Sequence, residues 1–442
     1  MNGSEIRDVS ASMALDSRGT PTVASRVVLA SGATGRATAP AGASAGSHEA
    51  AELRDGGARY AGRGVSRAVK HVNSVLADAV RGIDAADQSA VDSALRACDG
   101  TANLARLGAN AVLAVSVAAS LAAAEHVGQP PYRWWAVEND PLLPLPMINI
   151  FSGGAHAAGA LDVQDVLVVP LGAATFSEAI AWVWEVRHHL QCALADSGHP
   201  ARLVADEGGF GVRLESNRQA LELVTEAIAA CGLVPGEQVA IALDIAANEL
   251  LSVDRYVLGQ EGHRLRAAAF VEELVDWCRE FPVISVEDPM AEDDWSGWRL
   301  ATDSLDHLQL VGDDLFVTAK DRLERGIRDG IANTVLVKPN QCGTLAAACD
   351  VVDTARAAGY ATVLSARSGE TEETWLADLA VGWRAGQIKV GSLTRSERTA
   401  KWNRLLAIED ELGPGVEYAG GAALAGRHLT DHAWPDRASH DH

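Results

Sequence analysis

Five short apolar runs in the second half of the chain recur at a nearly constant interval, and this rhythm constrains the fold more than any other feature. The runs end at Glu287, Asp313, Lys338, Ala366 and Lys389, which are 26, 25, 28 and 23 residues apart. Helical patterns such as TLAAACDVVDTARAAG lie between them. A repeating strand–helix unit favours a β/α barrel, whose functional residues lie at the C-terminal ends of the strands. An open, doubly wound sheet is the alternative architecture.

The first third of the chain has a different pattern. Residues 1–60 alternate short β-branched runs with Gly-rich turns, which indicates a small antiparallel sheet. Residues 61–127 place Ala, Leu and Val at helical spacing, and the Pro-rich segment 128–146 is irregular. We therefore expect an α/β protein with an N-terminal α+β capping domain over residues 1–135 and a C-terminal barrel over residues 140–430.

Composition narrows the range of partners and compartments. A formal charge of −22 over 442 residues argues against nucleic acid or an anionic membrane as a partner. We find no apolar run of the roughly 18 residues that a membrane span needs, and the start, MNGSEIRDVS, lacks the features of a signal peptide. The six cysteines are scattered and form no CxxC pair, which favours reduced thiols. We expect a cytoplasmic protein.

Lysine is rare in this chain. Only five of the 37 basic residues are lysine, and two of these, Lys338 and Lys389, end strand-like runs of the barrel. Two ammonium groups close to each other and to a dication would lower each other's pKa, so that one could act as a general base, a role that arginine cannot take. Exposed surface lysines are the alternative interpretation.

Three carboxylates follow apolar strand-like runs, namely Asp244 in IALDIAANE, Glu287 in VISVEDP and Asp313 in LVGDDLF. They should converge at the mouth of the barrel, where three hard oxygen ligands without nearby His or Cys suit Mg²⁺ better than zinc. Helix N-capping is the alternative, but it does not easily explain a glutamate. Glu207 lies in the Gly-rich loop ADEGGFG, where backbone can approach a ligand closely.

Ten motifs between about residues 6 and 413 resemble, in their order, those of enolase (phosphopyruvate hydratase). They are LDSRGTPTV, PAGASAGSHEAAELRDG, PMINIFSGGAHAAGALDVQD, ADEGGFG, ALDIAANE, SVEDPMAEDDWSGW, LVGDDLFVT, VKPNQCGTL, SARSGETEETWLADLAVG and GQIKVGSLTRSER. The resemblance implies a capping domain, a modified TIM-like barrel, a magnesium-dependent lyase (hydro-lyase), and a homodimer or octamer of dimers. It also implies two Mg²⁺ ions per site, the first held by Asp244, Glu287 and Asp313 and the second held with the help of Ser44 in the GASAG loop.

The resemblance implies further roles for side chains around these metals. They are Lys338 as the base that removes the C2 proton, Glu207 as the acid that helps hydroxide leave C3, Lys389 as the anchor of the substrate carboxylate, Arg367 with Ser368 as the phosphate grip, and His156 on a loop that closes over the substrate.

Two positions depart from the motifs. Where the family has a histidine before the Arg-Ser pair, this chain has Ala366, and where the family reads Gln-Glu it has Gln164 and Asp165. That glutamate supports the acid on the leaving-hydroxyl side in the family, and aspartate withdraws the carboxylate by about 1.5 Å. Because the expected metal ligands and both lysines are retained, we expect enolate chemistry on a changed substrate.

The expected substrate is a small anionic phosphorus compound whose phosphorus group is bulkier than phosphate, since Ala366 opens space beside the grip. This favours a product of the carboxyphosphonoenolpyruvate type, as in phosphonate or phosphinate biosynthesis. Ordinary dehydration of 2-phosphoglycerate to phosphoenolpyruvate is the alternative, and a non-catalytic, enolase-like binding protein is a second.

Overall fold

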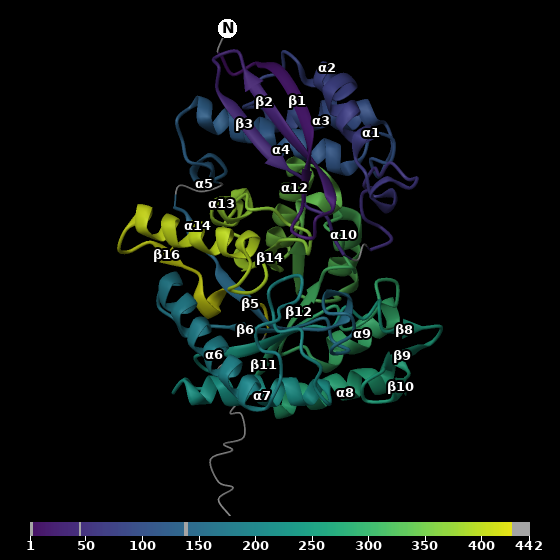
Figure 1. Cartoon of the computed structure of the whole chain (residues 1–442), viewed down its shortest axis with the longest axis vertical. Coiled ribbons are helices and arrows are strands. Elements are labelled where there is room, and N and C mark those ends of the chain that lie inside the picture. The colour runs from purple at the N-terminus through teal and green to yellow at the C-terminus, as the bar shows by residue number, and fades with distance from the viewer. Residues whose placement is uncertain (1–2, 44–45, 137–139, 427–442) are drawn as a thin grey trace, which may run out of the picture.

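The computed structural model describes residues 3–43, 46–136 and 140–426 (Figure 1). The N-terminal domain contains a three-stranded antiparallel sheet in the order β1-β2-β3, as the sequence predicts. Its strands are β1 (Ile6–Leu15), β2 (Pro21–Leu29) and β3 (Thr34–Thr38). The helices that follow are α1 (Ser66–His71), α2 (Ala77–Val80), α3 (Gln88–Asp99), α4 (Ala109–His126) and α5 (Pro131–Trp134), with a π-helical turn (Val72–Leu76) between α1 and α2.

Helix α4 is the central helix of this domain. Its 18 residues are long and apolar enough to cross a membrane, so the expectation that no segment reaches this length is wrong here. However, 83% of that window is buried inside the domain, where α4 packs against β2 and β3. Gly35 permits this contact, because a Cβ at that position would lie 1.9 Å from the carbonyl oxygen of Ala118. The apolar length of α4 therefore serves the core of the domain.

The second part of the chain forms a closed eight-stranded barrel, which confirms the barrel and excludes the open sheet. The strands, in their order around the barrel, are β11 (Val283–Glu287), β12 (Gln309–Gly312), β13 (Thr334–Val337), β14 (Ala361–Ser365), β15 (Gly386–Lys389), β5 (Leu145–Ser152), β6 (Asp165–Val169) and β7 (Ala240–Asp244). All neighbours are parallel except that β6 runs antiparallel to both β5 and β7.

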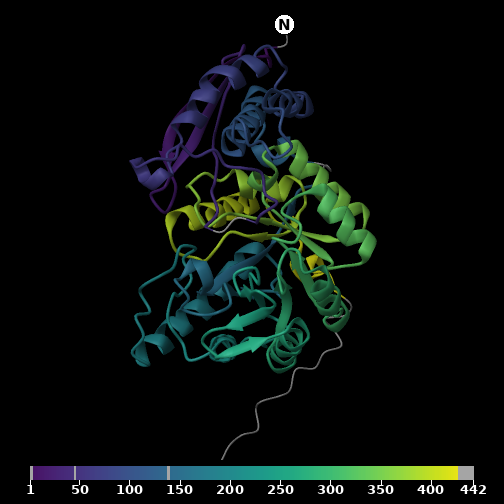
Figure 2. The same cartoon turned by 90° about the vertical axis from the view of Figure 1, so that its right-hand side faces the viewer.

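Helices lie around the outside of the barrel (Figure 2). They are α6 (Phe176–Asp196), α7 (Asn217–Ala230), α8 (Ala267–Glu280), α9 (Trp295–Ser304), α10 (Lys320–Asp329), α11 (Pro339–Cys342), α12 (Leu345–Ala357), α13 (Trp375–Gly382) and α14 (Ser396–Leu412). The short strands β8 (Leu251–Ser252), β9 (Arg255–Leu258) and β10 (His263–Leu265) form a separate sheet, and β4 (Leu142–Leu143) pairs with β16 (Glu417–Tyr418).

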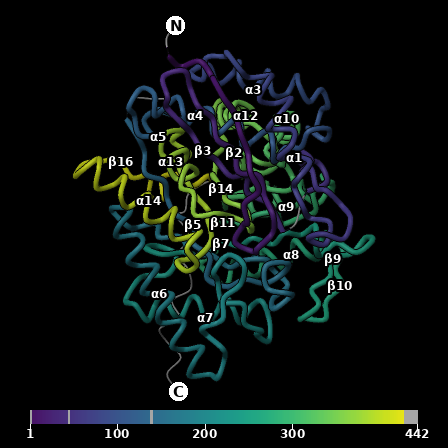
Figure 3. The backbone as a smooth tube through the Cα atoms, turned by 45° about the horizontal axis from the view of Figure 1, so that its top comes forward, coloured from purple at the N-terminus to yellow at the C-terminus, as the bar shows by residue number. Residues whose placement is uncertain are grey.

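The inside of the barrel is filled by apolar side chains from most of its strands, so it is a packed core. Polar side chains gather instead at the C-terminal ends of the parallel strands. The N-terminal domain lies against this part of the barrel (Figure 3), and the backbones of Ala41 and Gly369 form a β-bridge between the two. The functional pocket is therefore closed on one side by the N-terminal domain.

Candidate active site

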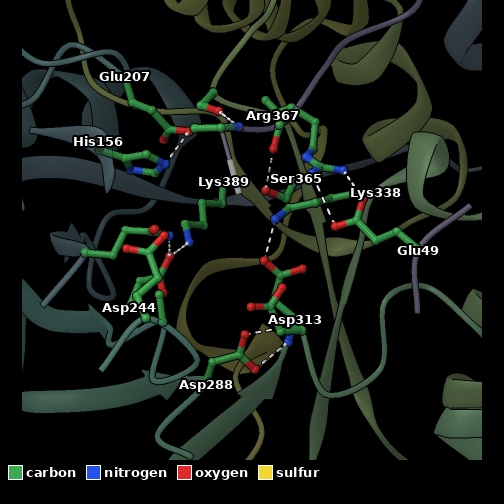
Figure 4. Close-up of a pocket in the computed structure, with 18 residues that line it drawn as sticks. Glu49, His156, Glu207, Asp244, Asp288, Asp313, Lys338, Ser365, Arg367 and Lys389 are labelled. Atoms are coloured by element: carbon green, nitrogen blue, oxygen red, sulfur yellow. Dashed lines mark hydrogen bonds and ion pairs between the residues drawn. The ribbon is translucent and has the colours of Figure 1, made fainter. Parts of the chain in front are cut away.

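A pocket lies at the mouth of the barrel (Figure 4). Most of the residues predicted for the site line it, together with loop residues of the N-terminal domain. The lining includes Gly42, Ala43, Glu49, His156, Gln164, Glu207, Asp244, Asp313, Lys338, Ala366, Arg367, Ser368 and Lys389. Asp165 and Glu287 are buried next to the lining, and Ser44 lies outside the described residues.

Lys389 joins two of the predicted metal ligands. It ends β15, and its Nζ donates hydrogen bonds of 2.7 Å to Asp244 Oδ2 and to Glu287 Oε2. These carboxylates end the neighbouring parallel strands β7 and β11, where they are register partners. Gln164 Nε2 donates to the same Asp244 oxygen at 3.1 Å. Burial alone would lower the pKa of Lys389, but the two carboxylates hold that pKa well above its usual value.

Lys338 follows β13 and donates a hydrogen bond to Asp313, which also accepts one from Gln341 Nε2 at 3.0 Å. The sequence analysis expects the two lysines to lower each other's pKa, and Lys389 does act in this direction on Lys338. Burial, Arg367 and Lys389 act to lower the pKa of Lys338, but the charges of Asp313 and Glu287 together outweigh them and the pKa is raised. Each ammonium group therefore lies against carboxylates that the sequence predicts as metal ligands.

The carboxylates at this end of the barrel fit a hard cation. Burial and the charge of Asp244 raise the pKa of Glu287 well above its usual value, and Glu287 Oε1 is buried without a hydrogen-bond partner among the described residues. Such an oxygen suits a cation. The group with oxygens within 4.8 Å of one another at this place is Asp288, Asp313 and Asp314, of which only Asp313 is a predicted metal ligand. The donors are all oxygens, which suits Mg²⁺.

Asp288 and Asp314 escaped the sequence analysis, although each directly follows a predicted ligand in the doublets ED and DD. Asp288 accepts hydrogen bonds from the backbone N–H groups of Asp313 (3.0 Å) and Asp314 (2.7 Å). Burial, followed by the charges of Asp314 and Asp313, holds the pKa of Asp288 well above its usual value. Asp288 therefore ties β11 to the loop after β12.

A second group of side chains faces the lysines across the pocket. Asp165 is the first residue of β6, and the reversed direction of that strand brings it to the mouth of the barrel. Asp165 Oδ2 lies 2.9 Å from His156 Nδ1, and Oδ1 accepts hydrogen bonds from Ser152 Oγ (2.9 Å) and from Asn149. The sequence predicts Asp165 as support for Glu207, but its hydrogen-bond partner is His156.

His156 in turn faces Glu207, with 3.9 Å between His156 Nε2 and Glu207 Oε1. Burial alone would lower the pKa of His156, but the charges of Asp165 and Glu207 raise it to about 9. Burial would raise the pKa of Glu207, but His156, and then Arg398, lower it. His156 and Glu207 therefore form an imidazolium–carboxylate pair at neutral pH.

Arg367 lies two positions beyond the end of β14 and binds a carboxylate of the N-terminal domain. Its Nη1 donates to Glu49 Oε2 at 2.9 Å and its Nη2 to Glu49 Oε1 at 3.2 Å, while Asn340 Oδ1 accepts from Nη1 at 3.0 Å. Ser368 Oγ accepts a hydrogen bond of 2.6 Å from the backbone N–H of Ala43. Sequence analysis missed Glu49, because its partner lies 318 residues away and only the motif GSHEA marked its position.

Ala366 directly precedes Arg367 and Ser368 in the chain. Its methyl group lines the pocket beside Arg367 and Ser368, and its backbone N–H donates to the carbonyl oxygen of Lys389 at 2.9 Å. The backbone of this position is therefore fixed by the neighbouring strand, and the residue forms part of the pocket lining.

Comparison with known families covers almost the whole chain. Residues 6–135 match the model described as "Enolase, N-terminal domain", and residues 140–426 match that described as "Enolase, C-terminal TIM barrel domain". The antiparallel sheet with its helices and the closed barrel lie within these two matches. The two matches place a cap and a barrel in the order that the motifs predict, and the protein is therefore a member of the enolase family.

Proposed function

We propose that the protein is a magnesium-dependent lyase that removes the C2 proton of a small phosphorus-bearing acid, expels a group from C3 and so forms an enolpyruvate ester of phosphorus. The observation that carries this proposal is the arrangement of one pocket. Lys338 and Lys389 meet three strand-end carboxylates on one side, and His156 and Glu207 lie on the other. A base and a proton donor on opposite sides of a substrate are what such an elimination requires.

Asp244, Glu287 and Asp313 are the residues that would hold the metal. When bound, Mg²⁺ would supply positive charge to stabilise the dianion formed when a proton next to a carboxylate is removed. In the proposal Lys338 takes the C2 proton on its amine, because lysine, unlike arginine, can lose its own proton. Lys389 holds the substrate carboxylate.

The same pocket supports a changed substrate. In the proposal the guanidinium of Arg367 and the hydroxyl of Ser368 bind the phosphorus group. The Ala366 methyl leaves space beside them where the family has an imidazole ring, so a larger phosphorus substituent would fit. We therefore favour a product of the carboxyphosphonoenolpyruvate type, as in phosphonate or phosphinate biosynthesis. Dehydration of 2-phosphoglycerate is the second candidate, favoured by the retained Arg367–Ser368 pair.

The proton-abstraction step can be tested by exchange of the substrate C2 proton in deuterated water, followed by NMR with Mg²⁺ present. Both 2-phosphoglycerate and the carboxyphosphono ester of glycerate should be offered. The Lys338→Ala and Lys338→Arg variants should lose the exchange, whereas Lys320→Ala, which removes an exposed lysine at the start of α10, should retain it. Exchange at the wild-type rate in either Lys338 variant would exclude this residue as the base.

A further inference from the structure

Asp165 is fully buried behind the pocket lining, and its side chain forms hydrogen bonds with neighbouring side chains of the protein. Oδ1 accepts from Ser152 Oγ and Asn149 Nδ2, and Oδ2 lies 2.9 Å from His156 Nδ1. Burial raises the pKa of Asp165, whereas the charge and the hydrogen bond of His156 act to lower it. With Asp165 as the acceptor, Nδ1 of His156 carries the proton that they share. Asp165 therefore fixes both the orientation of the ring and the position of one of its protons.

The other ring nitrogen of His156 faces Glu207 in the lining of the pocket. The distance of 3.9 Å between His156 Nε2 and Glu207 Oε1 is too long for a direct hydrogen bond. It is short enough that one hydroxyl oxygen, about 2.8 Å from each group, could hydrogen-bond to both. A substrate hydroxyl in that position would donate to the carboxylate and accept from Nε2–H.

We propose that Asp165 is a positioning residue that holds His156 with Nε2–H directed into the pocket, so that His156, and not Glu207, delivers the proton to the hydroxyl leaving C3. This rests on the proposed function. In the step, the electron pair of the C2–H bond forms the C2–C3 double bond, and the C3–O bond breaks with its electron pair on oxygen. The oxygen takes the proton from Nε2 and leaves as water. The ring is left neutral, with Nδ1–H still bonded to Asp165.

The directions of the pKa shifts of His156 and Glu207 agree with His156 as the proton donor. The pKa of His156 is raised to about 9, so the ring holds a proton to give at neutral pH. The pKa of Glu207 is lowered, so this side chain is a poor donor. The charged groups that act on this pair are Asp165 of β6, Asp244 of β7, Lys338 after β13, Lys389 of β15 and Arg398 of α14.

Aspartate has a shorter side chain than the glutamate of the family motif, and this explains why Asp165 acts as a positioning residue in this protein. A glutamate side chain is longer than an aspartate side chain by one methylene group, or about 1.5 Å. At the same backbone position it would therefore place its carboxylate nearer to the pocket. Aspartate keeps the carboxylate among Ser152, Asn149 and His156. In this chain the residue therefore acts through the imidazole ring.

The test uses Asp165→Asn, whose amide oxygen can still accept from Nδ1–H but carries no charge. Protein with labelled histidine and Mg²⁺ present is titrated by ¹⁵N NMR, and His156→Gln identifies the signals of His156. We expect the titration midpoint of His156 to fall by about one to three pH units in Asp165→Asn. Ser152→Ala, which removes only a neutral donor to Asp165, should shift the midpoint by much less.

A kinetic readout separates positioning from a merely structural role. Elimination by Asp165→Asn should be about 10² to 10⁴ slower than wild type, whereas C2 proton exchange, which depends on Lys338, should stay within about threefold. An unchanged midpoint, an equal shift in Ser152→Ala, or a parallel fall of exchange and elimination would each overturn the proposal. If wild type converts neither candidate substrate, the proposed function fails, while the NMR midpoints still decide whether Asp165 sets the state of His156.

Discussion

Ala366 follows β14 directly, and the residue is 6% exposed, next to Arg367 and Ser368 in the pocket lining. Asp165, the other departure from the family motifs, is fully buried across the pocket behind His156. Neither change breaks an ion pair of the site, since Lys338, Lys389 and Arg367 all retain carboxylate partners. At the scale of single residues, the two departures leave the ion pairs of the site in place, and in our proposal they change the shape of the pocket and the transfer of a proton.

The double variant Ala366→His with Asp165→Glu tests whether these two residues determine the choice of substrate. It restores the side chains of the family motifs, so turnover of 2-phosphoglycerate should rise, by up to about 10² to 10⁴ if a positioned proton-transfer group is regained. The native reaction should slow, because the new ring fills the space beside Arg367. The two changes belong together because groups acting in one site are not additive. Steady-state kinetics of wild type, both single variants and the double variant measure the effect, and an unchanged native reaction would contradict it.

At the scale of secondary-structure elements, the site residues that the sequence could predict are mainly those at the ends of strands. The interval of 23 to 28 residues marked β11 to β15, and the side chain at or just after each strand end does lie at one mouth. The reversed β6 lies outside this rhythm, so nothing in the spacing indicates that its first residue, Asp165, reaches the same mouth. The raised pKa of Lys338 also escaped prediction, because it depends on a direct contact with Asp313.

The carboxylates of Asp244, Glu287 and Asp313, which lie at three strand ends, should together bind one Mg²⁺ ion tightly. Loss of a second-shell partner costs metal affinity about 10- to 100-fold, so removal of a direct ligand should cost at least as much. Calorimetric titration with Mg²⁺ should show this loss in Glu287→Gln and in Asp313→Ala, and a smaller effect in Asp314→Asn. Asp321→Asn, an exposed carboxylate of α10, serves as the control. Tight binding that survives in Glu287→Gln and is lost in Asp314→Asn would assign the ion to the Asp288, Asp313 and Asp314 group.

The contact between β3 and α4 makes a prediction about stability. A Cβ at Gly35 would lie 1.9 Å from the carbonyl oxygen of Ala118 and 2.4 Å from the backbone nitrogen of Ala122. Because backbone atoms cannot rotate away, Gly35→Ala must push α4 off the sheet and should lower the free energy of unfolding by about 1–3 kcal/mol. In the control Gly259→Ala the new methyl would meet only Asp162 Oδ1, at 3.5 Å. Equal urea midpoints for Gly35→Ala and wild type would contradict this packing.

At the scale of the whole molecule, the pocket belongs to both domains. Glu49 and Ala43 come from the N-terminal domain and bind Arg367 and Ser368 of the barrel. The motifs at strand ends predicted much of the barrel side of the site. The contact from Glu49 joins distant parts of the chain, and neither periodicity nor charge pattern indicates such a pairing. Many of the side chains that the sequence singles out therefore line the pocket, and the structure adds Glu49, Asp288 and Asp314 and shows which residues are paired.

The central claim is that enolate chemistry is retained on a substrate with an enlarged phosphorus group. The most direct measurement compares kcat/KM of the unmodified protein, with Mg²⁺ present, for 2-phosphoglycerate and for the carboxyphosphono ester of glycerate. We expect the ester to be preferred by at least about 10², the lower range for a well-placed catalytic group. Turnover of 2-phosphoglycerate that equals or exceeds that of the ester would contradict the account and leave Ala366 as a tolerated variation in an ordinary enolase.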